Sequence, residues 1–146
     1  DKQKYPTAAA FRAAAKAAPG QITFASSGDG SPQHLGGLMF ETRTQSRMLH
    51  VPYKGGALAI NDILAGNVDA MFAVLPEALP HIKSGKLTAL AIMSDQRSPL
   101  IANVPTMREG GIADMTMITA VPRPKITPWP KFSQPSDVQM RVAAVS

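Results

Sequence analysis

The sequence predicts an α/β domain with a parallel or mostly parallel sheet and helices on both faces. Short apolar runs alternate with segments of helical periodicity from residue 7 to residue 93, which is the pattern of successive βαβ units. Small residues are plentiful and only 5% of residues are aromatic, a composition that suits alanine-rich helices packed on a sheet. At 146 residues the chain has the length of one ordinary domain.

Each predicted element has its own local signal. Strands are expected where short apolar or β-branched runs end at glycine, proline or serine, at residues 22–25, 47–51, 68–74 and 87–93. Helices are expected where the periodicity has start and stop signals, at residues 7–18, 32–42, 57–64 and 76–83, the first of them capped by Thr7. In the second helix, Leu35, Leu38 and Met39 are expected to face the sheet, and Gly36 and Gly37 to allow close approach.

The alternation weakens after Ser94. One helical turn is expected within residues 104–111, and a last strand at residues 115–119. Five prolines between residues 121 and 135 are too many for a helix or a central strand. We therefore divide the chain into an α/β half, residues 1–119, and a proline-rich tail or return segment, residues 120–146.

The loop after the first strand is the strongest candidate for a binding site. It consists of Ser26, Ser27, Gly28, Asp29, Gly30 and Ser31. Such small residues leave the backbone open to a ligand, and Ser31 followed by Pro32 is a good helix start. A helix N-terminus offers N–H groups and the positive end of the helix dipole, so the loop suits a carboxylate, phosphate or sulfate. The alternative is that Gly28 and Gly30 merely permit a tight turn.

A second junction of the same kind follows the second strand. It contains Tyr53, Lys54, Gly55 and Gly56. Ligands of parallel sheets bind at the carboxyl ends of the strands, so this segment would form a neighbouring wall, and Ala73 at the end of the third strand would lie nearby. An ordinary helix-capping turn is the other interpretation of residues 53–56.

Motifs for catalysis and cofactors are incomplete. Gln33 stands where a dinucleotide fingerprint needs its third glycine, and Ser27 lacks the frame of a nucleophile elbow. His34 and His81 have no partners at metal-ligand spacing, and no predicted loop carries two carboxylates. We expect no metal, no cofactor and no catalysis. An enzyme acting on small carboxylates is the rival hypothesis, and it would need His34 as a base near Ser27.

The net charge of +5 raises nucleic acid as a partner, but the distribution of charge opposes it. The basic residues are scattered singly and are not interleaved with aromatic residues. We therefore expect a solvated surface with mild attraction for anions rather than nucleic-acid binding or a regulatory module. The chain has no cysteine and no run of about 18 apolar residues that would span a membrane. No signal peptide begins at Asp1, which fits a cytoplasmic protein or one whose export signal has been removed.

Five motifs resemble one protein family in order and spacing. They are SSGDGSPQHL at 26–35, HVPYKGGA at 50–57, MF at 71–72 with LPEALPHIKSGKL at 75–87, RSP at 97–99 and VPT at 104–106. This set, within residues 7–112, resembles the tripartite tricarboxylate transporter substrate-binding proteins, the Bug-type periplasmic receptors. The family carries acidic or amide residues after the Met-Phe pair, where this chain has Ala73 and Val74.

The resemblance implies the second lobe of a two-lobed, venus-flytrap receptor located in the periplasm. The ligand would be a small carboxylate: a di- or tricarboxylate, an acidic amino acid or an aromatic acid. Membrane permease subunits would be its partners, and the complete receptor would be a monomer. Residues 26–31 with His34, residues 53–56 and Ala73 would then form this lobe's half of the carboxylate site.

Overall fold

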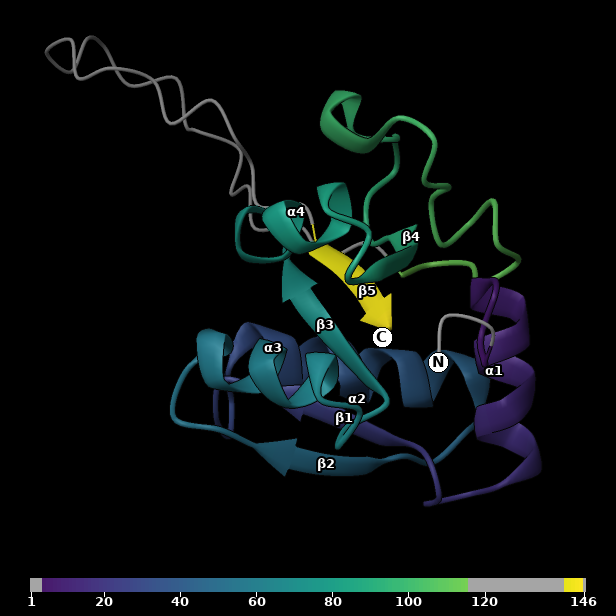
Figure 1. Ribbon diagram of the computed structural model, residues 1–146. Coiled ribbons are helices and arrows are strands. Elements are labelled where there is room, and N and C mark those ends of the chain that lie inside the picture. Colours follow the sequence, from purple (N-terminus) through teal and green to yellow (C-terminus); the bar gives the residue numbers. More distant parts are fainter. Residues whose placement is uncertain (1–3, 116–140, 146) are drawn as a thin grey trace, which may run out of the picture.

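The computed structural model describes residues 4–115 and 141–145, and it places helices on both faces of a five-stranded sheet (Figure 1). The four helices are α1 (Ala8–Ala17), α2 (Pro32–Thr44), α3 (Gly56–Leu64) and α4 (Leu75–Lys83). The strands are β1 (Thr23–Ser26), β2 (Leu49–Pro52), β3 (Ala70–Val74), β4 (Thr88–Ile92) and β5 (Arg141–Val145). The predicted α/β class and the first four strands and helices are therefore confirmed, with ends that differ by a few residues. Within the described residues, no helix is long and apolar enough to cross a membrane.

The sheet has the order β2-β1-β3-β5-β4 and is mixed rather than fully parallel. Strand β1 pairs in parallel with both β2 and β3, whereas β5 lies between β3 and β4 and is antiparallel to each (Figure 1). Part of the predicted tail or return segment thus supplies an inner strand, because residues 141–145 form a short run that can pair on both edges. Residues 116–140, which include most of the expected strand at 115–119 and all the prolines after residue 121, lie outside the described residues.

Alternating side chains of the inner strands divide the core between the two faces of the sheet. Phe24 and Phe72 pack with Phe11 of α1 and Phe40 of α2 in one cluster. The strand residues next to those two phenylalanines, Ala25, Met71 and Ala73, belong to the other cluster. That cluster also contains residues of α3 and α4, namely Ile60, Ile63 and Ala78. This period of two is what a strand buried on both sides requires.

Helix α2 packs on the sheet through a different face from the one predicted. Leu35 and Leu38 are 46% and 42% exposed, and Met39 is only partly buried. The buried positions are Gln33, Gly36, Gly37, Phe40 and Thr44, which share the same helical spacing. The expected close approach is confirmed, since a Cβ atom on Gly37 would overlap the Phe24 ring. Backbone packed on aromatic rings therefore orients the helix, and its leucines point outward.

The segment after β4 is irregular. The expected turn within residues 104–111 is a single hydrogen-bonded turn, in which the Gly110 N–H donates to the Thr106 carbonyl over 3.0 Å. Glu109 and Thr106 cap each other: the Thr106 N–H donates to Glu109 Oε2 (2.7 Å) and the Glu109 N–H donates to Thr106 Oγ1 (3.1 Å). A 3-10 helix at Pro99–Ile101 precedes this turn and was not expected from the sequence.

Candidate functional site

The carboxyl ends of β1 and β2 bring the two predicted loops together. Ser26 and Pro52 are register partners at the end of the parallel pair. The Tyr53 N–H donates to the Ser26 carbonyl over 2.9 Å, and a Cβ atom on Gly28 would lie 3.6 Å from the Tyr53 carbonyl oxygen. The first loop, residues 26–31, and the second loop, residues 53–56, therefore line the same edge of the sheet, as the sequence predicted.

The first loop ends on a capped helix. Ser31 Oγ accepts the His34 N–H over 3.3 Å, and Pro32 is in the first turn of α2. Gly28 and Gly30 have φ angles of +129° and +72°, a region that residues with a side chain seldom adopt. The predicted cap and the need for glycine are therefore confirmed at the N-terminus of α2.

The N–H groups of this loop are not all unpaired. Gly28 donates to Ser26 Oγ (3.1 Å), Gly30 donates to His34 Nδ1 (3.0 Å), and Ser31 donates to the Gly28 carbonyl (3.2 Å). The sequence argument assumed open donors, but short polar side chains bond readily to nearby backbone. An anion that used the Gly30 N–H would have to replace the His34 side chain there.

Two histidines, His34 of α2 and His50 of β2, stack beside the first loop, and we call them the histidine pair. Their ring centroids are 3.9 Å apart and their planes differ by 6°. His50 also stacks on Phe24, and its Nε2 lies 2.6 Å from Ser26 Oγ. Burial lowers the pKa of His50, and the nearby His34 lowers it further, whereas the carboxylates of Asp29 and Glu41 act in the opposite direction.

Asp29 completes a cluster that has the composition of a metal site. Ligand atoms of Asp29, His34 and His50 lie within 4.8 Å of one another. An imidazole nitrogen binds a metal in the plane of its ring, however, and these two rings are parallel. The lone pairs of the histidine pair therefore run side by side and do not converge on one point, so the arrangement does not fit a metal.

Ser26, His50 and Asp29 also have the order of a nucleophile, a base and an orienting acid, since His50 Nδ1 lies 3.5 Å from Asp29 Oδ1. Ser26 is fully buried, and its hydroxyl is bonded to Gly28 as well as to His50. A substrate carbonyl has no access to that oxygen. The pairing that the rival enzyme hypothesis needs is not formed either, because the Ser27 hydroxyl donates to Gln33 Oε1 and not to His34.

The second loop is occupied by contacts of its own. The Tyr53 hydroxyl donates to Asp62 Oδ2 of α3 over 2.7 Å, and burial together with this carboxylate raises the pKa of Tyr53 to about 12. Lys54 is exposed. Gly55 precedes α3 with a φ of +134° and no side-chain cap, and a Cβ atom on Gly56 would lie 2.7 Å from Glu77 Oε2. The Glu77 carboxylate therefore lies against the start of α3.

Three residues that the sequence analysis did not include join the two loops. Gln33 accepts a hydrogen bond from the Ser27 hydroxyl and donates one to Glu77 Oε2 over 3.5 Å, and His50 is hydrogen-bonded to Ser26. Gln33 is buried, whereas His50 is half-buried and Glu77 is exposed, and their residue types alone do not mark them as neighbours of the loops. Ala73, which was included, is fully buried in the core beside α3 and α4. Its side chain therefore packs inside the domain.

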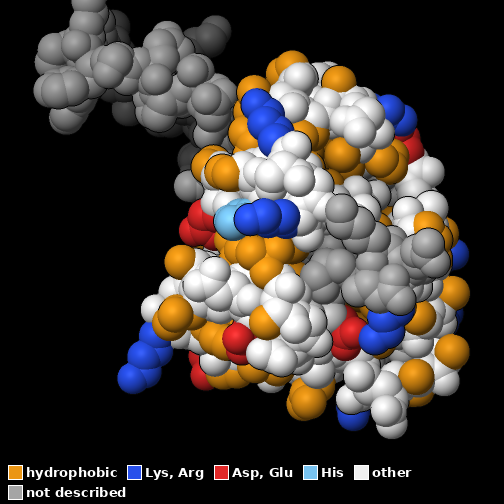
Figure 2. Space-filling model, in the orientation of Figure 1, with side chains coloured by type: hydrophobic (Ala, Val, Ile, Leu, Met, Phe, Trp, Pro, Cys, Tyr) orange, Lys and Arg blue, Asp and Glu red, His pale blue; other side chains and the backbone are white. Residues whose placement is uncertain are grey.

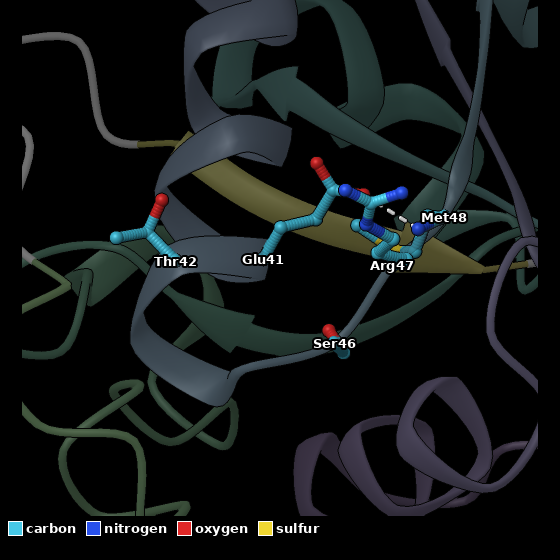
Figure 3. Close-up of a pocket in the computed structure, with 5 residues that line it drawn as sticks. All are labelled: Glu41, Thr42, Ser46, Arg47 and Met48. Carbon is cyan, nitrogen blue, oxygen red and sulfur yellow. Dashed lines mark hydrogen bonds between the residues drawn. The ribbon is translucent and has the colours of Figure 1, made fainter.

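A separate hollow lies at the other end of α2 (Figure 3). It is lined by Glu41, Thr42, Ser46, Arg47 and Met48. Glu41 points toward the segment that enters β2, and its carboxylate accepts the Met48 N–H over 2.5 Å. Because this hollow lies at the amino end of β2, it is not part of the edge that carries the two loops.

Comparison with known proteins assigns the chain to a family. A model described as the tripartite tricarboxylate transporter family receptor matches residues 3–135. The chain belongs to this receptor family. BugT of Bordetella pertussis is 43% identical over 110 residues, which are 75% of this chain and 34% of BugT. A protein encoded in the tcbD-tcbE intergenic region of a Pseudomonas species is 36% identical over 118 residues, 79% of this chain and 35% of that protein.

Solved structures of other receptors share the fold. MatC from Rhodopseudomonas palustris, with bound malate, has a TM-score of 0.75 and 26% identity over 80% of this chain and 40% of MatC. The periplasmic binding protein BugD has a TM-score of 0.72 and 26% identity over 96% of this chain and 40% of BugD. The chain spans about a third of the length of the curated relatives it matches.

Proposed function

We propose that this chain is the second lobe of an extracytoplasmic receptor that captures a small carboxylate. The observation that carries the proposal is the first loop, where two glycines of positive φ and a capped helix N-terminus lie at the carboxyl edge of parallel strands. Membership of the receptor family supports it, and so does the malate bound to MatC. A dicarboxylate such as malate is therefore the ligand class to test first.

The division at residue 119, the permease partners, the periplasmic location and the monomeric state belong to the same proposal. Known relatives more than twice as long as this chain support a first lobe that completes the site. The scattered basic charge supports a small anion over nucleic acid, since Figure 2 shows Lys and Arg side chains dispersed over the face in view. The contacts of Ser26 and Ser27 offer no nucleophile, so the enzyme hypothesis is not favoured.

The test is a titration of the isotope-labelled chain with malate, followed by backbone NMR. If an intact receptor binds at about micromolar, roughly −8 kcal/mol, and each lobe contributes about half, this chain should bind at about millimolar. Shift changes should concentrate in residues 27–34 and 53–56, and the uncharged diamide of malate should not produce them. No change up to saturating malate, or changes confined to the hollow around Glu41, would contradict the proposal.

A further inference from the structure

The starting point is the hydrogen bond from the Gly30 N–H to His34 Nδ1, which is 3.0 Å long. A ring nitrogen that accepts a hydrogen bond has no proton, so the neutral ring carries its proton on Nε2. Gly30 is also one of the donors that the first loop would use to hold a carboxylate. In its neutral form, His34 therefore occupies the group that the ligand needs.

Protonation reverses the role of the side chain. An imidazolium carries protons on both nitrogens and cannot accept from Gly30. The two N–H groups would then face each other, the Gly30 donor would be released, and a positive charge would stand in the first turn of α2. Both changes favour an anion at the loop. We propose that His34 is a protonation-dependent gate of the anion site, closed when the ring is neutral and open when it is charged.

The titratable and charged groups around His34 come from several elements. His50 of β2 stacks on it at 3.9 Å, so two charged rings would repel each other. The side chain of His50 is only 18% exposed, and its pKa is lowered by burial and by His34. The acidic groups nearby, Asp29 of the loop and Glu41 of α2, act on His50, and β1 and β3 present the uncharged Phe24 and Phe72 to α2. From α4, the Glu77 carboxylate approaches the first turn of α2 and accepts a hydrogen bond from Gln33.

This inference rests on the proposed function and adds the direction in which carboxylate affinity changes with pH. Carboxylates of a dicarboxylate ionise near pH 4, well below the range in which histidine titrates, so between pH 8 and pH 6 the protein group changes more than the ligand. Falling pH charges His34 and releases Gly30. Affinity for the carboxylate should therefore rise as pH falls, by about tenfold if one charge-assisted contact is gained.

Two measurements on the chain test the gate. Without ligand, the Gly30 amide and the His34 ring nitrogens should titrate together in NMR spectra, with Nδ1 unprotonated at pH 8. Malate titrations at pH 6 and pH 8 should then differ by about tenfold in the wild type and in His81→Gln, a control that removes a histidine of α4 outside the two loops. The difference should vanish in His34→Gln and persist in His50→Gln.

The outcomes separate the two claims. Malate binding of equal strength at both pH values would overturn the gate and leave the proposed receptor function standing. A pH effect lost in His50→Gln but kept in His34→Gln would also overturn it. No malate binding at either pH would refute the proposed function, and the gate with it. If His34→Gln fails to fold, the wild type still provides a test. A chemical shift of the Gly30 amide that stays constant while His34 is protonated would count against the gate.

Discussion

The two strand-to-helix junctions have the same sequence signature but different occupants. In the first loop, a serine caps α2 and a histidine side chain takes up the Gly30 donor. In the second loop, α3 begins without a side-chain cap, and the carboxylate of Glu77 lies against Gly56. A positive helix end already faced by an acidic side chain has less attraction for another anion. The two helix starts therefore differ in what an external anion would have to displace, a neutral histidine side chain in the first loop and a carboxylate in the second.

The largest expected effect comes from adding a side chain at the glycines of positive φ. Gly30→Val should lower malate affinity by more than tenfold, because it blocks the loop, and destabilise the fold by about 1–3 kcal/mol through backbone strain. Gly55→Val, the matched change in the second loop, should cause a similar loss of stability with little loss of affinity. Thermal unfolding measures the loss of stability in both variants, and calorimetry measures the loss of malate affinity, each on the longest form of the protein that folds. Equal losses of malate affinity in the two variants would show that the second loop contributes to binding as much as the first.

Removal of the α2 cap should have a smaller effect. Ser31→Ala should cost about 1 kcal/mol of unfolding free energy, since Ser31 Oγ accepts the His34 N–H. Thr7→Ala is the control, because Thr7 caps α1 in the same way, away from the two loops. Denaturant unfolding should give similar losses for both, but only Ser31→Ala should also weaken malate binding. A weakening by Thr7→Ala as well would show that affinity merely follows stability.

Neutralising the internal anion of the second loop tests the comparison directly. Glu77→Gln should raise malate affinity by about two- to fivefold and cost about 0.3–1 kcal/mol of stability, because it removes one negative charge from the positive ends of α3 and α4. Asp114→Asn is the control, which neutralises an exposed carboxylate outside the two loops. Calorimetry at several salt concentrations should show the gain shrinking as salt rises. Unchanged affinity would mean that Glu77 does not compete for the site.

The smallest expected effect is on stability as a function of pH. The folded state lowers the pKa of His50, so the unfolded chain binds more protons near pH 6 than the folded protein does. Stability should therefore fall as pH drops through the usual histidine range near 6.5. In His50→Gln this part of the pH dependence should disappear, while His81→Gln should keep it. A wild-type stability that rises from pH 8 to pH 6 would contradict the direction stated for His50.

Local chemistry could be predicted from the sequence alone. Thr7 and Ser31 were expected as helix caps, and both accept a backbone N–H in the structure. Gly28 and Gly30 were expected to leave the backbone open, with a tight turn as the alternative, and the positive φ of both fits the turn. These features depend on a few neighbouring residues, so a short stretch of sequence determines them. The alternation of strands and helices follows from the same kind of signal.

Contacts between distant residues were decided only by the tertiary structure. The sequence determined that a strand, a glycine-containing loop and a helix start occur twice, but not that Glu77 approaches one helix start or that His50 stacks on His34 at the other. It also did not show that β5 enters the sheet between β3 and β4, or that α2 turns its glycines inward. Packing of the whole core selects among faces that have equal helical spacing, and strand order depends on which edges remain to be paired. The physical reason is that a cap or a turn, including the Gly30–His34 contact, is formed within about one helical turn of chain, whereas Glu77 and His50 are brought to the two helix starts by other elements of the fold.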